Sequence, residues 1–126
     1  MPKSILVVDD DPSIARMYAT ALSQVGVVTT AGSGTEAVAI LSARAFDAII
    51  LDIRMPGLGG LDVLDRCFPN GHQGTAVFVV TADQTDEVRS EAMKRGAIFQ
   101  FTKPVPLKML LEQVRAQLER RRSGKP

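Results

Sequence analysis

Apolar and polar positions follow two alternating spacings along most of this chain. Short apolar runs, rich in β-branched residues, are typical of strands covered on both faces, and they are expected at residues 4–8, 27–31, 48–51, 76–80 and 98–101. Between and after these runs, apolar residues recur every three or four positions, as in helices that pack through one side. The pattern therefore predicts five strands that alternate with five helices.

The first helical stretch has recognisable ends. Asp11 directly precedes Pro12, and this pair is typical of an N-cap residue followed by proline at the first helical position. The helical spacing of apolar residues continues to Val25. We therefore expect Gly26 to end this helix.

The chain of 126 residues, 45% of them hydrophobic, is long enough for one domain with a buried core. Its last apolar stripe ends at Leu118 and is followed by the polar sequence Glu-Arg-Arg-Arg-Ser-Gly-Lys-Pro. We expect one domain over residues 1–121 and a polar C-terminal tail over residues 122–126.

Alternating strands and helices predict an α/β fold in which parallel strands are joined by right-handed crossovers. The expected class is a doubly wound (βα)5 sandwich of the flavodoxin-like type. Its five-stranded parallel sheet would have the order 2-1-3-4-5, with helices on both faces. In such a sheet, ligands bind beyond the carboxyl ends of the strands, where the strand order reverses.

Charged and hydroxyl side chains follow four of the five predicted strands. Asp9 and Asp10 follow the first strand, Asp52 follows the third, Thr81 the fourth and Lys103 the fifth. Since the first and third strands are neighbours in the predicted order, the three acids would converge. Three carboxylates repel one another unless a cation lies among them, and a site made only of oxygen ligands favours Mg²⁺.

The composition excludes several other classes of protein. The formal net charge of +1 gives no overall field that would attract nucleic acid or a membrane surface. The arginines at 120–122 suit the negative C-terminal end of a helix dipole, which explains them without DNA contact. The single cysteine, Cys67, cannot form an internal disulfide, and no apolar run is long enough to cross a membrane. We expect a cytoplasmic domain that binds neither nucleic acid nor membranes directly.

Four motifs together resemble the receiver domain of two-component response regulators: VVDDDP, LDIRMPGLGG, VVTAD and FTKP, in this order and spacing. The resemblance extends over residues 4–121. It implies a phosphoacceptor signalling domain that assists its own phosphoryl transfer and dephosphorylation, rather than an enzyme. Asp52 would take a phosphoryl group from a histidine kinase, a histidine phosphotransfer protein or a small acyl phosphate.

The resemblance also implies roles for the other residues at the strand ends. Asp9, Asp10, the Asp52 carboxylate and the backbone carbonyl of Arg54 would hold Mg²⁺. On the phosphoryl group, Thr81 would hydrogen-bond one oxygen and Lys103 would pair with another. The family pattern further suggests a cis peptide bond before Pro104.

One position departs from the family pattern. Receivers usually carry an aromatic residue three positions before the lysine, and its rotation follows the movement of the threonine, here Thr81. In this chain that position is Gln100, and the side chain of the adjacent Phe101 should point to the opposite face of the strand. How phosphorylation would change the conformation without this aromatic residue is therefore an open point. The lifetime of the phosphate is also open, and Arg54 and Asp83 are expected to tune it.

Partners and rival functions also remain open. The resemblance places a downstream protein partner on the face formed by the fourth helix, the fifth strand and the last helix, and it leaves open a dimer that forms on phosphorylation. The chain could be a stand-alone regulator or part of a longer one.

An aspartate-nucleophile phosphatase would need a second acid two positions after Asp52, where this chain has Arg54. A flavodoxin-like cofactor binder would need a phosphate loop where the acids stand, and a pseudo-receiver would not need the complete set of site residues.

Overall fold

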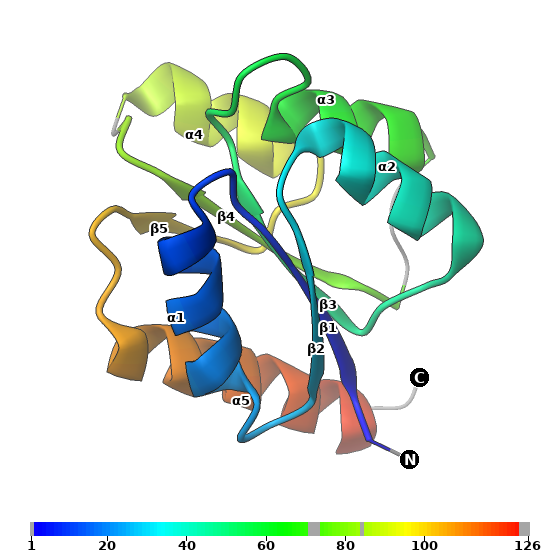
Figure 1. The fold of residues 1–126 in the computed structure, drawn as a ribbon, viewed down its shortest axis with the longest axis vertical. Helices are drawn as coiled ribbons and strands as arrows, with labels where there is room; N and C mark the ends of the chain where they lie inside the picture. The colour runs from blue at the N-terminus through cyan, green and yellow to red at the C-terminus, as the bar shows by residue number, and fades with distance from the viewer. Residues whose placement is uncertain (1, 71–73, 84, 124–126) are drawn as a thin grey trace.

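The computed structural model describes residues 2–70, 74–83 and 85–123. Five strands alternate with five helices along these residues (Figure 1). The strands are β1 (Ser4–Val8), β2 (Val27–Ala31), β3 (Ala48–Asp52), β4 (Ala76–Thr81) and β5 (Phe99–Thr102). The helices are α1 (Pro12–Leu22), α2 (Gly34–Ala43), α3 (Gly60–Cys67), α4 (Asp86–Lys94) and α5 (Leu107–Ser123).

The five strands form one parallel sheet in the order β2-β1-β3-β4-β5. This confirms the doubly wound topology predicted from the sequence. The strand order reverses between β1 and β3, so the crevice beyond their carboxyl ends is the expected place for a ligand.

The sheet separates two apolar cores. Alternate residues along each central strand face opposite sides, because successive side chains of a strand point in opposite directions. On one side α1 and α5 cover the sheet, and on the other α2, α3 and α4 cover it (Figure 1). Every residue of β1 after Ser4 and every residue of β3 and β4 is buried, which explains why these strands are continuous apolar runs up to the polar residues at the ends of β3 and β4.

Side-chain caps define where three helices begin. The Asp11 carboxylate accepts hydrogen bonds from the backbone N–H groups of Ser13 and Ile14, with Pro12 in the first helical turn, as predicted. Ser33 and Thr85 cap α2 and α4 in the same way. These caps satisfy N–H groups that have no partner within the helix.

The boundaries of four predicted elements differ from the structure. The first helix ends at Leu22 rather than at Gly26, because Val25 N–H bonds to the Leu22 carbonyl and tightens the chain into a turn. Val25 still packs against the core, so apolar spacing alone could not show that the helix had ended. The third and fourth strands each run one residue further than predicted, and β5 begins and ends one residue later.

The last helix continues through the basic residues to Ser123. The predicted boundary between domain and tail, after residue 121, therefore lies within α5, and residues 124–126 lie outside the described part of the chain. No helix in the described ranges has both the length and the apolar character needed to cross a membrane.

Candidate functional site

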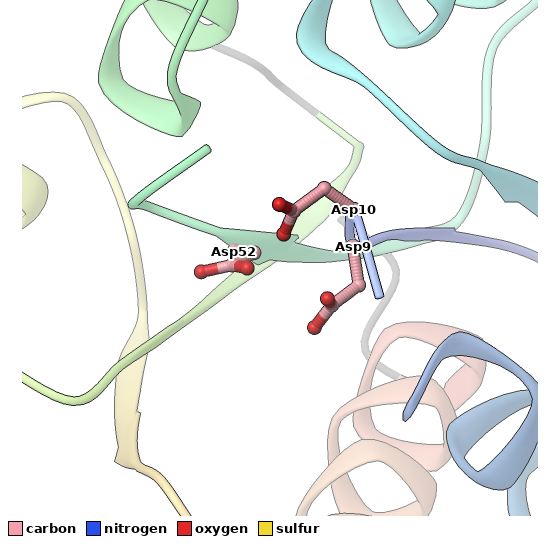
Figure 2. Close-up of side chains that lie close together, drawn as sticks. All are labelled: Asp9, Asp10 and Asp52. Atoms are coloured by element: carbon pink, nitrogen blue, oxygen red, sulfur yellow. The ribbon is translucent and has the colours of Figure 1, made fainter. Parts of the chain in front are cut away.

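Three carboxylates meet at the point where the strand order reverses. Asp9 and Asp10 follow β1 directly, and Asp52 is the last residue of β3, the strand next to it. One oxygen from each of the three residues lies within 4.8 Å of one oxygen from each of the others. Figure 2 shows the three side chains gathered around the ends of the two strands.

Because two of these acids are buried, placing them so close together destabilises the fold when they are charged. Asp9 is 1% exposed and Asp52 is 2% exposed, whereas Asp10 lies at the surface. Charged carboxylates that lose water repel one another more strongly than they do in solution. In addition, the buried Asp9 Oδ2 forms no hydrogen bond with any described residue. A hard divalent cation would bind this oxygen and neutralise the repulsion among the acids, so the three carboxylates suit Mg²⁺.

Lys103 supplies a positive charge to the same site. It directly follows β5, and the peptide bond between Lys103 and Pro104 is cis, as the resemblance suggested. Its Nζ donates a hydrogen bond to Asp52 Oδ2 at 3.0 Å and lies 3.4 Å from Asp9 Oδ2. Burial disfavours the charged form of Lys103, but the hydrogen bond to Asp52 and the charges of both acids outweigh it and raise the pKa of Lys103.

The pKa of Asp52 is also raised. Burial of the carboxylate is the main cause, and the nearby charge of Asp9 adds to it. The hydrogen bond from Lys103, its positive charge and the hydrogen bond from the Arg54 N–H oppose this shift without cancelling it. A cation placed beside Asp52 would therefore stabilise the charged form of its carboxyl group.

This shift predicts a pH dependence of stability in buffer without divalent cations. Between the ordinary aspartate pKa of 3.8 and the raised value, folded Asp52 holds its proton while unfolded Asp52 has lost it. The free energy of unfolding should then fall as the pH rises through that window. Urea unfolding at a series of pH values in EDTA measures the slope. Asp52→Asn should lack this contribution, and an identical slope in both proteins would contradict the assignment.

Thr81 lies at the end of β4 and is fully buried. Its Oγ1 accepts a hydrogen bond from the Asp83 N–H at 3.0 Å, which ties the hydroxyl to the loop that follows β4. The Asp83 carboxylate in turn pairs with the guanidinium of Arg54, from the loop after β3. The pair joins the two loops beside Asp52, a contact that the sequence alone did not indicate.

Glycines allow the loop after β3 to lie close to the end of the strand that carries Asp52. Gly57 has a φ of 73°, in the left-handed region that favours glycine. A Cβ on Gly60 would lie 2.4 Å from the Asp52 carbonyl oxygen. Any larger residue at this position would push α3 away from the end of β3.

Gln100 and Phe101 point to opposite sides of β5, as predicted. Phe101 is 2% exposed and belongs to the core between the sheet and α1 and α5. Gln100 pairs in register with Val79, next to the strand end that carries Thr81. The Gln100 Oε1 is buried and has no hydrogen-bond partner among the described residues.

Tyr18 is a polar residue near the site that the sequence pattern did not single out. It has the spacing of the apolar residues of the first helical stretch, and it is 3% exposed in the core between the sheet and α1 and α5. Its phenol nevertheless interacts electrostatically with Lys103, Asp9 and Asp52. The signal that could have found it is a residue with a polar tip on an otherwise apolar helix face.

A parallel α/β sheet with acids where its strand order reverses is typical of a doubly wound domain that binds a ligand. Comparison with known proteins shows to which family of such domains the chain belongs. The family model for the response regulator receiver domain matches residues 5–115. The chain is 35% identical over 120 residues to the probable transcriptional regulatory protein TcrX of Mycobacterium tuberculosis, covering 94% of this chain and 51% of TcrX. It is 36% identical over 121 residues to the response regulator MprA of Mycobacterium sp. (strain KMS), covering 95% of this chain and 52% of MprA.

Solved structures agree with this match. The BeF3-activated DrrB receiver domain superposes with a TM-score of 0.85 at 30% identity, covering 95% of this chain and all of that one. This chain belongs to the response regulator receiver domain family, and it is a signalling domain of two-component systems. It spans about half the length of TcrX and MprA, the curated relatives named above.

Proposed function

We propose that this receiver domain accepts a phosphoryl group on Asp52 in a reaction that depends on Mg²⁺. The observation that carries the proposal is the convergence of Asp9, Asp10 and Asp52 within 4.8 Å at the switch point of the sheet. The Nζ of Lys103 lies 3.0 Å from Oδ2 of Asp52, the proposed nucleophile. Family membership supports the same chemistry, because receivers act as phosphoacceptors.

In the proposed step, an Asp52 carboxylate oxygen attacks the phosphorus of the donor. A new O–P bond forms while the bond to the leaving group breaks, and the leaving group keeps the electron pair. A phosphohistidine on a kinase or phosphotransfer protein would release the imidazole, and acetyl phosphate would release acetate. The protein mainly positions the groups and neutralises charge, because the transition state of phosphoryl transfer is loose.

Asp9, Asp10, Asp52 and the backbone carbonyl of Arg54 would hold the metal ion. Bound Mg²⁺ would neutralise charge on the acids and on the incoming phosphoryl group. Lys103 would move from the carboxylates to a phosphoryl oxygen, since its ammonium already lies beside them. The Thr81 hydroxyl, on the neighbouring strand, would donate a hydrogen bond to a second oxygen.

Intact-protein mass spectrometry tests this function directly. After incubation with acetyl phosphate and Mg²⁺, we expect a single phosphoryl adduct, which should not form in EDTA. An adduct that forms equally without Mg²⁺ would contradict the metal role. Absence of an adduct with acetyl phosphate and with a phosphorylated histidine donor would favour a pseudo-receiver that only binds partners.

We further propose that the pair between Arg54 and Asp83 covers the approach of water to phosphorylated Asp52. The pair joins the loops after β3 and β4, and Asp83 also holds Thr81 through its backbone N–H. Because the two side chains act as one unit, removing either should change the lifetime of the adduct in the same direction. Opposite effects of Arg54→Ala and Asp83→Ala on the decay rate would argue against a shared role.

We propose that the signal leaves through the face formed by α4, β5 and α5. Two large apolar side chains on this pair of helices are exposed, Met93 at 48% and Met109 at 44%. The charged residues expected beside a docked partner are Arg89, Lys94 and Lys108. Gln100 would replace the usual aromatic at the switch position. A Met93→Glu variant that takes up phosphate normally but loses its partner or its dimer would support this face; unchanged association would place the contact elsewhere.

A further inference from the structure

Asp83 lies between the candidate site and the start of α4. Its backbone N–H donates a hydrogen bond at 3.0 Å to Oγ1 of Thr81, the last residue of β4. Its side-chain Oδ1 accepts a hydrogen bond from the Thr85 N–H at 2.9 Å. Asp83 therefore bonds to the hydroxyl at the strand end through its backbone, and to the residue that caps α4 through its side chain.

Thr85 continues this connection into α4. It is the N-cap residue, and its Oγ1 accepts a hydrogen bond from the Val88 N–H at 3.3 Å. That N–H has no acceptor within the helix, so the cap supplies one. Of the three hydrogen bonds that lead from Thr81 to α4, this one is the longest, and long hydrogen bonds are weak. A displacement of the loop should therefore break the cap first.

The two ends of α4 are held differently. Ala92, near the C-terminal end, is the only buried residue of the helix, and in the first turn, residues 86–89, only Val88 is half-buried. Arg95, directly after α4, donates from Nε and Nη2 to the two carboxylate oxygens of Asp65 in α3, at 2.9 and 3.3 Å. Paired bonds of this kind fix the geometry of the contact. The C-terminal end of α4 is therefore attached to the core and to α3, while the N-terminal end depends mainly on its cap.

Gln100 offers no comparable connection at the position where receivers usually carry an aromatic residue. Its Oε1 is buried and has no hydrogen-bond partner within the described part of the chain. The hydrogen bonds through Asp83 connect Thr81 to α4 without involving this residue.

We propose that Asp83 couples a movement of Thr81 to the N-terminal end of α4, and that Arg95 confines the movement to that end. The Thr81 hydroxyl accepts the Asp83 N–H, so its own hydrogen is free to donate to a phosphoryl oxygen. When the hydroxyl turns toward a phosphoryl group on Asp52, it draws the Asp83 N–H with it. The Asp83 carboxylate then draws Thr85 away from the first turn of α4, which loses its cap while the last turn stays in place. The inference rests on the proposed function of Asp52 and names the route by which phosphorylation reaches α4.

Beryllofluoride, the group that activated the DrrB receiver domain, tests this coupling. Hydrogen exchange of single backbone N–H groups, followed by NMR with and without beryllofluoride and Mg²⁺, measures how firmly each is held. Loading should speed exchange of the Val88 N–H about threefold to tenfold, the range for loss of one neutral hydrogen bond. The N–H groups of residues 93–95 should not change. An unchanged Val88 rate in a protein that binds beryllofluoride, or equal acceleration at both ends of α4, would overturn the proposal.

Asp83→Ala and Asp83→Asn form a matched pair of variants. Alanine removes the acceptor of the Thr85 N–H, so the response of Val88 to beryllofluoride should be lost. Asparagine removes the charge that pairs with Arg54 but keeps a side-chain oxygen that can accept the Thr85 N–H, so the response should persist. Gln100→Met should also retain it. A response that survives in Asp83→Ala, or that is lost in Asp83→Asn or Gln100→Met, would overturn the proposal.

A double-mutant cycle in EDTA decides the coupling without phosphorylation. Thr81→Val keeps the shape of the buried side chain and removes the oxygen that accepts the Asp83 N–H. It should speed exchange of the Val88 N–H about threefold to tenfold. It should add nothing to the effect of Asp83→Ala, because both act through the same hydrogen bonds. Additive effects, or no effect of Thr81→Val, would overturn the coupling, whereas a wild type that forms no phosphoryl adduct would count against the proposed function alone.

Discussion

Asp52→Asn is expected to abolish phosphoryl uptake while leaving the fold intact. The neutral amide oxygen is too weak a nucleophile to form the acyl phosphate link. The substitution preserves the shape of the side chain, and its single amide oxygen can still accept one of the two hydrogen bonds that Asp52 receives, from Lys103 at Oδ2 and from the Arg54 N–H at Oδ1. It also removes a buried charge that burial disfavours, so the metal-free variant should be at least as stable as the wild type at neutral pH.

Intact mass after incubation with acetyl phosphate and Mg²⁺ measures the loss, and thermal unfolding in EDTA measures the stability. Asp62→Asn is a suitable matched control, because Asp62 is an exposed acid in the first turn of α3 and should leave uptake unchanged. An adduct that persists at the wild-type level in Asp52→Asn would place the nucleophile on another residue.

The second large effect is expected from Asp10→Ala. Asp10 is the exposed member of the three acids, so its removal should disturb the core least. Mg²⁺ affinity should fall by at least roughly tenfold to a hundredfold, which is the usual effect of losing a residue that only supports a metal ligand, because here a charged oxygen ligand itself is lost. In metal-free buffer the same variant should unfold at a higher temperature, since one of three mutually repelling carboxylates is gone.

Isothermal titration with Mg²⁺ and thermal unfolding in EDTA test the two halves of this prediction separately. Asp10→Asn separates charge from coordination: it should relieve the repulsion in the same way but retain an oxygen that can bind the metal. An Asp10→Ala protein that melts at a lower temperature than the wild type in EDTA would refute the repulsion argument, whatever its metal affinity.

Local signals predicted most of the elements correctly. The Asp11–Pro12 cap, the continuous apolar strands and the opposite orientation of Gln100 and Phe101 all follow from backbone geometry over a few residues. The helix ends were predicted less well. Val25 has the right spacing for α1 but packs from a turn, because apolar burial does not require helical backbone.

Contacts between segments far apart in the chain could not be predicted in the same way. The pair between Arg54 and Asp83 joins two loops 29 residues apart, and each residue alone is an ordinary surface charge. Tyr18 has the spacing of a core residue, and only in the folded chain do the charges of Lys103, Asp9 and Asp52 affect the pKa of its phenol, which burial raises. The pairing of such groups depends on how the loops and helices are oriented, and spacing along the chain does not encode this.

By itself, the sequence determined the alternation of strands and helices, the class of fold and the residues that stand at the strand ends, because hydrophobic periodicity and turn chemistry are local. The tertiary structure decided which of those side chains are buried, how closely the three carboxylates approach, and that Lys103 already pairs with two of them. These properties depend on parallel pairing between β1 and β3 and on the loss of water from their ends. Burial and distance set the charge balance of the site, and both exist only once the sheet has formed.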